Sequence, residues 1–160
     1  AVFVLNDELG GIYSFDPVDP AFKLDDPQVS QKHTIVDLGE DVFTVGRPHP
    51  MIDPSIRTER MEREAEDPDV AVVLLDCVIG YGSHEDPAGA LVPAITKMKT
   101  AAEKRGGYLA VVASVTGTEG DFQNIAVQRR RLEDAGAVVM PSNHQAAQLV
   151  RRMIATLAAR

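Results

Sequence analysis

The chain has 160 residues, a length typical of one domain, and 44% of them are hydrophobic and 25% charged. The 24 acidic residues outnumber the 16 basic ones, and the net charge of −8 argues against binding to nucleic acid or to an anionic membrane, since both need a basic surface. No stretch approaches the ~20 apolar residues of a membrane span. The single cysteine, Cys77, predicts a reducing compartment, so we expect a cytoplasmic protein.

Residues 1–32 are predicted to form an extended arm rich in proline and aspartate. Gly10-Gly11 is followed by prolines set among aspartates, at a density that resists regular structure. The arm should either wrap the domain formed by residues 33–160 or link it to another one. Its apolar residues Ile12, Tyr13 and Phe15 could anchor it on that domain.

From residue 33 onward, strand patterns and helix patterns alternate. Thr34–Leu38 predicts a first strand, and Asp53-Pro54 predicts a helix start with an N-cap and a proline at the first helical position. Two continuous apolar runs, residues 70–75 and 109–114, predict strands of a parallel sheet with both faces buried. The other predicted elements are a helix from Asp86-Pro87 to Gly106, a helix from an N-cap at Asp121 to Ala135, a strand over 137–140, and a final helix capped by Ser142 or Asn143.

These units predict an α/β fold, a flavodoxin-like three-layer sandwich with a parallel sheet of four to five strands and helices on both faces. A dinucleotide site is rejected, because no Gly-x-Gly-x-x-Gly follows the first strand and Gly80-Tyr81-Gly82 lacks the third glycine. In such sheets, ligands bind in the loops at the carboxyl ends of the strands. The predicted loops there are residues 39–52, 76–86, 115–121 and 141–144.

Histidines are frequent on these loops, where His49, His84 and His144 lie. A histidine changes its protonation near neutral pH and suits proton or phosphoryl transfer, although it can also simply fix a loop through hydrogen bonds. His49 lies between two prolines that restrict its backbone, and the adjacent Arg47 could clamp a carboxylate or phosphate. We therefore take His49 and His84 as candidate catalytic residues.

The third loop contains glycines and opens a helix, which favours anions. Its acidic residues Glu119 and Asp121 instead favour an amide, a carbonyl, or a phosphate carried with a divalent cation. No Cys/His spacing typical of zinc occurs, so no protein metal site is predicted. The candidate residues for binding substrate or anion are Arg47, Gly80, Tyr81, Gly82, Thr116, Gly117, Thr118 and Asp121.

Three motifs resemble the FdrA proteins, which are similar to succinyl-CoA synthetase. The motifs are His33–Gly39, Gly46–Pro54, and Asp76–Gly82 followed by Asp86–Gly89, and the resemblance extends over residues 9–155. Near the end, Arg131–Gly136 and the residues up to Ser142 resemble the final helix, strand and loop of the synthetase α subunit.

The resemblance implies a CoA-ligase domain of the succinyl-CoA synthetase type. In the synthetases, a Gly-His-Ala-Gly segment carries a histidine that is transiently phosphorylated, and a glutamate between glycines follows the second strand. Here the matching segments, Gly117–Asp121 and Ile79–Gly82, contain neither a histidine nor a glutamate between glycines. The family also implies CoA or a phosphorylated small molecule with Mg²⁺ as cofactor, bound mainly by other domains. FdrA-type proteins are further associated with carbamoyl transfer to oxamate, as one subunit of several.

Two hypotheses for the function remain open, and a third is weaker. The first is part of an enzyme for acyl or carbamoyl transfer, in which Arg47 holds an anion and His49 or His84 moves protons. The second is a non-catalytic ligand-binding or subunit-docking domain that has lost the phosphohistidine chemistry. A receiver-like signalling domain is disfavoured because no lysine follows the late strand at Met140. The expected partners are a small acyl, carbamoyl or phosphate ligand, and either further copies of the chain or companion subunits.

Overall fold

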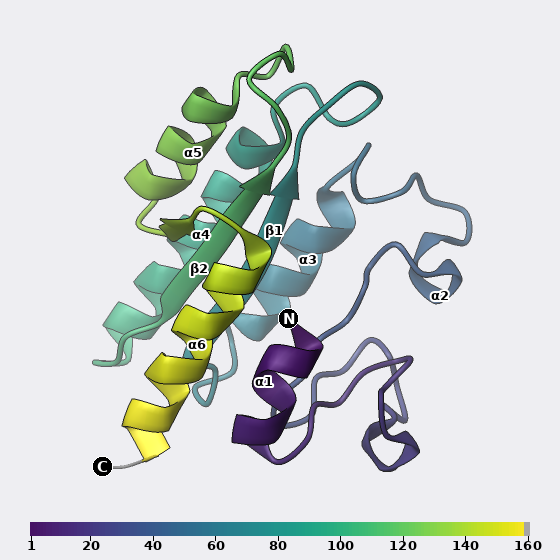
Figure 1. The fold of residues 1–160 in the computed structure, drawn as a ribbon. Coiled ribbons are helices and arrows are strands. Elements are labelled where there is room, and N and C mark those ends of the chain that lie inside the picture. The colour runs from purple at the N-terminus through teal and green to yellow at the C-terminus, as the bar shows by residue number, and fades with distance from the viewer. Residues whose placement is uncertain (159–160) are drawn as a thin grey trace.

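The computed structural model describes residues 1–158, so residues 159 and 160 at the end of the predicted domain lie outside it (Figure 1). The helices and strands, in chain order, are α1 (Val2–Leu9), the 3₁₀ helix η1 (Pro20–Phe22), α2 (Asp41–Thr44), α3 (Ser55–Glu64), β1 (Val72–Val78), α4 (Pro87–Lys104), β2 (Ala110–Thr116), α5 (Ile125–Asp134), β3 (Val138–Met140) and α6 (Asn143–Ala158).

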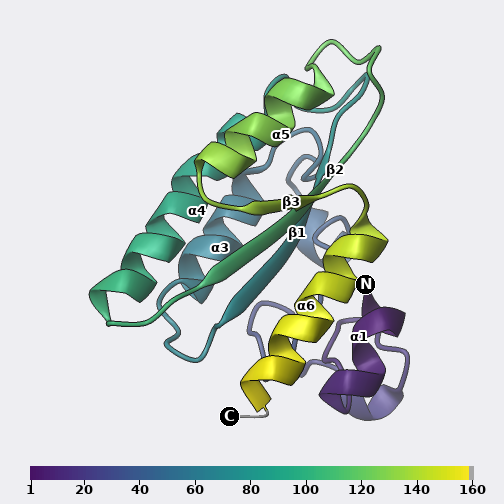
Figure 2. The same ribbon diagram turned by 60° about the vertical axis from the view of Figure 1, so that its left-hand side comes forward.

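The described residues form a parallel sheet in the order β1-β2-β3, covered by helices on both faces. Figure 2 shows α3, α4 and α5 along one side of the sheet, and α1 and α6 along the other. The predicted α/β architecture, with a parallel sheet between two helical layers, is therefore confirmed. Both crossovers, β1–α4–β2 and β2–α5–β3, pass over the same face.

Alternation along the central strand β2 divides the interior into two cores. Val111, Ala113 and Val115 face α3, α4 and α5, where Leu91, Ile95, Met98 and Leu132 are fully buried. Val112 faces the opposite side, where α1 and α6 contribute Leu5, Ala146 and Val150. The continuous apolar pattern of the strand thus has the predicted cause, burial of both faces.

The sheet has three strands within residues 1–158, rather than the four to five expected. Thr34–Leu38 forms no strand of the sheet. Its backbone pairs with the arm instead, since Ile35 N–H donates to Tyr13 O at 2.9 Å and Tyr13 N–H donates to His33 O at 2.8 Å. The local apolar pattern was correctly read as extended chain, but it could not identify the partner.

Three smaller expectations also need correction. Val2–Leu9 is helical, not extended, because its apolar side chains pack against α6. Helix α5 begins after Asn124, whose side chain accepts the N–H groups of Ala126 and Val127, and not at Asp121. His144 belongs to the first turn of α6 and not to a loop.

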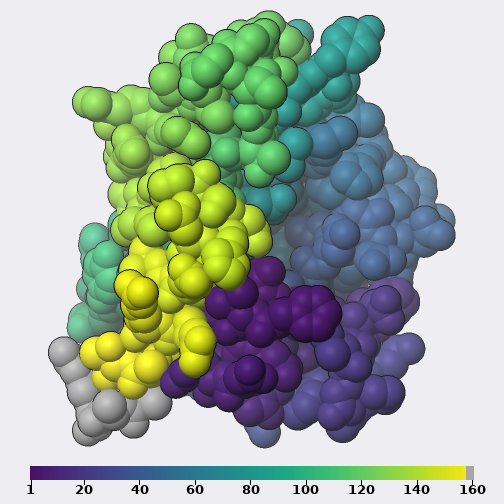
Figure 3. All heavy atoms as spheres, viewed as in Figure 1, coloured from purple at the N-terminus to yellow at the C-terminus, as the bar shows by residue number. Residues whose placement is uncertain are grey.

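Besides the pairing at Tyr13, the arm is fastened to the domain through α1 and through Arg60 of α3. Figure 3 shows α1 and α6 side by side on one face of the molecule, consistent with their shared core. On α3, the buried guanidinium of Arg60 donates to Pro27 O at 3.0 Å and to Ser30 Oγ at 2.7 Å, and it pairs with Glu64 at 2.6 Å. Among the described residues, no helix combines the length and apolar character required to cross a membrane.

Candidate functional site at the strand ends

Two loops follow the carboxyl ends of neighbouring strands, residues 79–86 after β1 and residues 117–124 after β2 (Figure 1). They lead into α4 and α5, at the end of the sheet where open α/β proteins bind ligands. The hydrogen bonds between them, and from the first loop to residues 49–53, determine which predicted site residues are held together.

Gln123 is the main link between the two loops. Its side chain is only 6% exposed. Its Oε1 accepts the Gly80 N–H at 3.2 Å, and its Nε2 donates to Gly80 O at 3.0 Å, to Ser83 Oγ at 2.8 Å and to His84 O at 3.1 Å. A buried amide is stable only when its polar atoms are paired, and here both ends are used. Gln123 therefore fixes the shape of the loop after β1.

Gln128 extends this network to the start of α4. It is 2% exposed, its Oε1 accepts the Ala88 N–H at 2.9 Å, and its Nε2 donates to Asp86 Oδ1 at 3.0 Å and Gln123 O at 3.3 Å. Asp86 caps α4, as predicted, and also pairs with Arg131 of α5. The N-termini of α4 and α5 are thus both closed by side chains, which leaves the loops before them as the open part of the edge.

His84 connects the loop after β1 to residues 49–53, since its N–H donates to Met51 O at 2.8 Å. Its Nδ1 accepts the Asp86 N–H at 3.0 Å, and in the same way His49 Nδ1 accepts the Met51 N–H at 3.2 Å. An Nδ1 that accepts a hydrogen bond carries no proton, so each neutral ring carries its proton on Nε2. Both histidines can therefore donate from Nε2, and neither has a free basic nitrogen in this arrangement. The ring of His49 also lies against Gly39, where an added Cβ would come within 2.4 Å of Nε2.

Arg47 is occupied by an ion pair rather than open to a ligand. Its NH1 and NH2 groups donate to Glu59 at 2.9 and 2.6 Å, and NH2 also contacts Ser55 Oγ at 3.4 Å. The hydrogen bond to Glu59 raises the pKa of Arg47 and lowers that of Glu59. The pKa of Asp53 is lowered by its hydrogen bonds with Ser55, with smaller contributions from Arg47 and His84. An anion would have to compete with Glu59 for this guanidinium.

The loop after β2 is shaped by Asp121 and Gly117. Asp121 Oδ2 accepts the Thr118 N–H at 2.5 Å and the Thr118 hydroxyl at 3.0 Å, so this carboxylate closes its own loop. A Cβ at Gly117 would lie 2.1 Å from Ile79 Cγ1, so the absence of a side chain lets the two loops approach each other. Thr116, at the end of β2, is exposed, and its carbonyl accepts the Ile79 N–H at 2.9 Å.

The tip of the loop after β1 is open to solvent. Gly80 and Gly82 have φ values of 140° and 82°, which other residues rarely adopt, and the Tyr81 side chain between them is fully exposed. The N–H groups of Tyr81, Gly82, Glu119 and Gly120 donate to no other group within residues 1–158. These four amides, on two loops that Gln123 joins, are free donors for a ligand oxygen.

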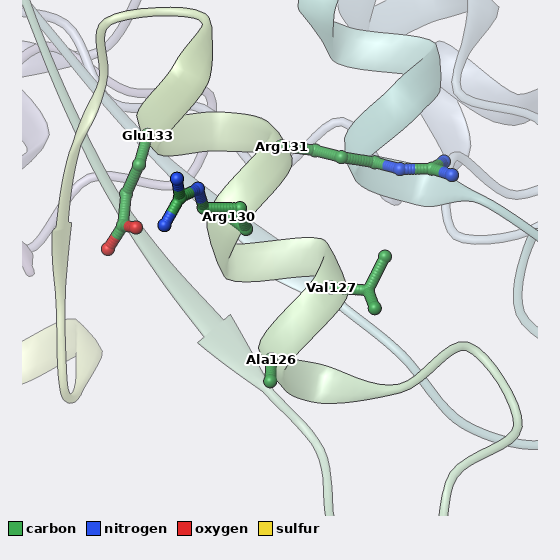
Figure 4. A pocket seen from close by; sticks show the side chains of 5 residues that line it. All are labelled: Ala126, Val127, Arg130, Arg131 and Glu133. Carbon is green, nitrogen blue, oxygen red and sulfur yellow. The ribbon is translucent and has the colours of Figure 1, made fainter.

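A shallow depression on α5 lies apart from these predicted residues. It is lined by Ala126, Val127, Arg130, Arg131 and Glu133 (Figure 4). Figure 4 shows Arg130 and Glu133 on one side of the helix, whereas Arg131 points to the other. Across the described part of the chain, no three His, Cys, Asp or Glu side chains gather closely enough to hold a metal ion.

Two of the loops predicted from the sequence, those after β1 and β2, are joined by hydrogen bonds in the structure, but the residues that join them were not predicted. Gln123 and Gln128 were not singled out, because a glutamine on a charged helix segment usually faces solvent. Their one available signal is spacing. The five-residue interval, with Gln128 directly before three arginines, puts one amide before the helix and the other on its buried face.

The sequence pattern of the CoA-ligase family matches residues 9–153. This range spans the sheet, both strand-end loops and most of α6. The chain belongs to the CoA-ligase family. It is also 42% identical, over 153 residues, to the uncharacterized protein YahF of Escherichia coli strain K12. The alignment covers 96% of this chain and 30% of YahF, so the chain spans less than a third of that relative's length.

Proposed function

We propose that this CoA-ligase domain belongs to an FdrA-type protein and contributes to acyl or carbamoyl transfer through an acyl-phosphate-type intermediate, as one part of a larger enzyme. The observation that carries the proposal is the pair of loops at the strand ends, held together by Gln123 and carrying four free backbone N–H groups. Such donors suit the oxyanion that develops when a carbonyl group is attacked.

In the proposed reaction, an acceptor nitrogen or thiol attacks the carbonyl carbon of an acyl or carbamoyl phosphate. The bond from that carbon to the phosphate oxygen breaks, and the proton of the acceptor passes to the departing phosphate, which leaves as inorganic phosphate. The amides of Tyr81, Gly82, Glu119 and Gly120 would stabilise the carbonyl oxygen. His84 and His49 would donate from Nε2 to the leaving group, since a hydrogen bond there disperses its charge.

The remaining candidate residues have supporting roles in this proposal. Arg47 would exchange Glu59 for the anionic end of the substrate. Thr116, Gly117, Thr118 and Asp121 would shape the loop that faces the substrate. CoA, or a phosphorylated substrate with Mg²⁺, would be held mainly by partner domains or companion subunits, in a reducing cytoplasm.

The second candidate function is a non-catalytic docking or ligand-binding domain. It is favoured by the Arg47–Glu59 pair, which fills the predicted anion clamp, and by the absence of a histidine from Gly117–Asp121. A domain of this kind would bind a partner or ligand through the same loops without moving protons.

Ligand-dependent thermal unfolding tests the proposal. Carbamoyl phosphate, oxamate and CoA are each added with and without Mg²⁺, and binding to the folded state alone raises Tm. We expect at least one of them to raise Tm in the wild type, and His84→Gln to reduce the rise. His33→Gln, a change at an exposed histidine outside the strand-end loops, is the matched control and should leave it unchanged. If no compound raises Tm, even with partner subunits present, the enzymatic proposal fails.

A further inference from the structure

We infer that Gln123 is a positioning residue that fixes His84 in the tautomer with its proton on Nε2. The inference deepens the proposed function and rests on it, because His84 is there the donor that meets the substrate. Gln123 itself needs no contact with substrate, since it acts on the backbone that carries the histidine.

The backbone of His84 is held on both sides. Its N–H donates to Met51 O at 2.8 Å, and its carbonyl accepts Gln123 Nε2 at 3.1 Å. The histidine therefore has little freedom to rotate as a peptide unit. Gln123 holds His84 through its side chain, whereas Met51 does so through its backbone. A substitution can therefore remove the hydrogen bond from Gln123 but not the one to Met51.

The partner of the imidazole ring is held by the same network. His84 Nδ1 accepts the N–H of Asp86, two residues further along. Asp86 is in turn fixed through its carboxylate, which accepts Gly89 N–H at 3.1 Å and Gln128 Nε2 at 3.0 Å. Gln128 also donates to Gln123 O at 3.3 Å. Both ends of the turn from His84 to Asp86 are thus tied to the two buried glutamines.

Glutamine is the side chain that suits this position. The loop presents one donor, Gly80 N–H, and three acceptors, Gly80 O, Ser83 Oγ and His84 O. A glutamate would still accept the Gly80 N–H, but its second carboxylate oxygen would lie against Gly80 O, Ser83 Oγ and His84 O and could donate to none of them. A methionine would keep the volume and lose every hydrogen bond. Because the group is buried, the loop groups whose only printed partner is Gln123 would have to find water, and the turn would open. In Q123M these are the Gly80 N–H and His84 O, whereas Gly80 O keeps its hydrogen bonds from Ser83.

The chemical consequence concerns the direction in which His84 can transfer a proton. While the turn is closed, the Asp86 N–H occupies Nδ1, so Nε2 keeps its proton and serves as a donor. Once the turn opens, the two neutral tautomers exchange, and Nε2 becomes a base for part of the time. Gln123 thereby selects the donor role.

Nitrogen-15 NMR of the imidazole rings tests the inference on the whole chain. We expect a single Nε2–H tautomer for His84 in the wild type, and a mixture of tautomers in both Q123E and Q123M. Q148E is the matched control, because Gln148 is exposed on α6 and the change is chemically the same; it should leave His84 unaltered. Folded Q123E and Q123M variants that retain the single wild-type tautomer would overturn the inference.

Two further measurements keep the inference testable if these variants unfold. In the wild type, the Asp86 amide should exchange with solvent far more slowly than an unprotected amide, and unprotected exchange would refute the closed turn. Affinity for carbamoyl phosphate with Mg²⁺ should fall up to about tenfold in Q123M, the equivalent of one lost hydrogen bond. Equal affinity in the two proteins would overturn the inference. If the wild type binds none of carbamoyl phosphate, oxamate and CoA, even with partner subunits present, the proposed function is refuted, and the NMR result alone decides the role of Gln123.

Discussion

At the scale of single residues, Gly117 shows how the strand-end loops depend on a missing side chain. A Cβ there would lie 2.1 Å from Cγ1 of Ile79, which is only 5% exposed and has little room to move. We predict that Gly117→Ala lowers the free energy of unfolding by about 1–3 kcal/mol, the usual cost of overpacking a core. Urea unfolding measures it.

The same clash supplies an internal control. Gly120→Ala should have little effect, because the nearest atom to its Cβ, Thr118 Oγ1, is 3.8 Å away. Ile79→Ala removes the clashing atom, so the double variant Ile79→Ala, Gly117→Ala should be more stable than the sum of the single effects predicts. Strict additivity would contradict a direct contact.

Glu59 makes the stability of the chain depend on pH. The hydrogen bond from Arg47 holds the pKa of Glu59 below its ordinary value of 4.5. The folded chain therefore binds this proton less readily than the unfolded chain, so the pair stabilises the fold above pH 4.5, and this contribution is lost as the pH falls through the lowered pKa. We predict that Glu59→Gln flattens the acid side of the stability profile, measured by urea unfolding at a series of pH values. Glu103→Gln, an exposed change on α4, should leave that slope unaltered.

At the scale of elements, Arg60 links the arm to helix α3. Arg60 is 6% exposed, and its guanidinium reaches Pro27 O, Ser30 Oγ and Glu64. Arg60→Met would keep much of the apolar stem but leave these groups unpaired. We predict a loss of about 1–3 kcal/mol and faster tryptic cleavage at Lys23 and Lys32 on either side of the contact.

Arg130, an exposed residue of α5, provides the control for the Arg60 substitution. Within residues 1–158 it pairs only with Asp134 on the same helix, at 3.2 Å, and pairs of this kind contribute little. Arg130→Met should therefore leave both the stability and the rate of cleavage in the arm unchanged. Equal cleavage of the Arg60 and Arg130 variants would mean that the arm is held by other contacts.

The elements that the sequence predicted well are those with strong local signals. The apolar runs at 70–75 and 109–114 became β1 and β2, and the Asp86-Pro87 start became α4. The prediction that residues 34–38 form a strand of the sheet was wrong, because strand pairing depends on residues far apart in the sequence. This segment pairs with Tyr13 of the arm instead of with a strand of the sheet. Periodicity indicates extended chain but does not indicate its neighbour.

The candidate site was predictable only in outline. The rule that ligands bind at the carboxyl ends of strands brought out the loops with His49, His84 and Gly80–Gly82. Hydrogen bonds between side chains and distant backbone leave no periodic signal, so the role of Gln123 was not foreseen. Arg47 was predicted to be an anion clamp, but its partner Glu59 lies 12 residues further along on α3, and no local pattern showed that they would pair.

At the scale of the whole molecule, two cores share one sheet, and Cys77 lies within the larger of them. Its side chain has no exposed area, and burial raises its thiol pKa to about 11. A thiol reacts as the thiolate, so the folded protein should not be labelled at neutral pH. We predict that labelling of Cys77 by iodoacetamide reports global unfolding, and that its rate follows the urea transition. Fast labelling below that transition would show that the β1 side of the core opens locally.

The amide of Gln123 pairs with both backbone groups of Gly80, as a residue on an adjacent strand would. The shape of the loop after β1 is therefore encoded in part 43 residues downstream of it. A loop transplanted from a relative would lose its geometry unless this distant position came with it. For protein engineering, residues 79–86 and 117–124 should therefore be exchanged together. A chimera whose crossover lies between them would combine the loop after β1 with a different residue at position 123.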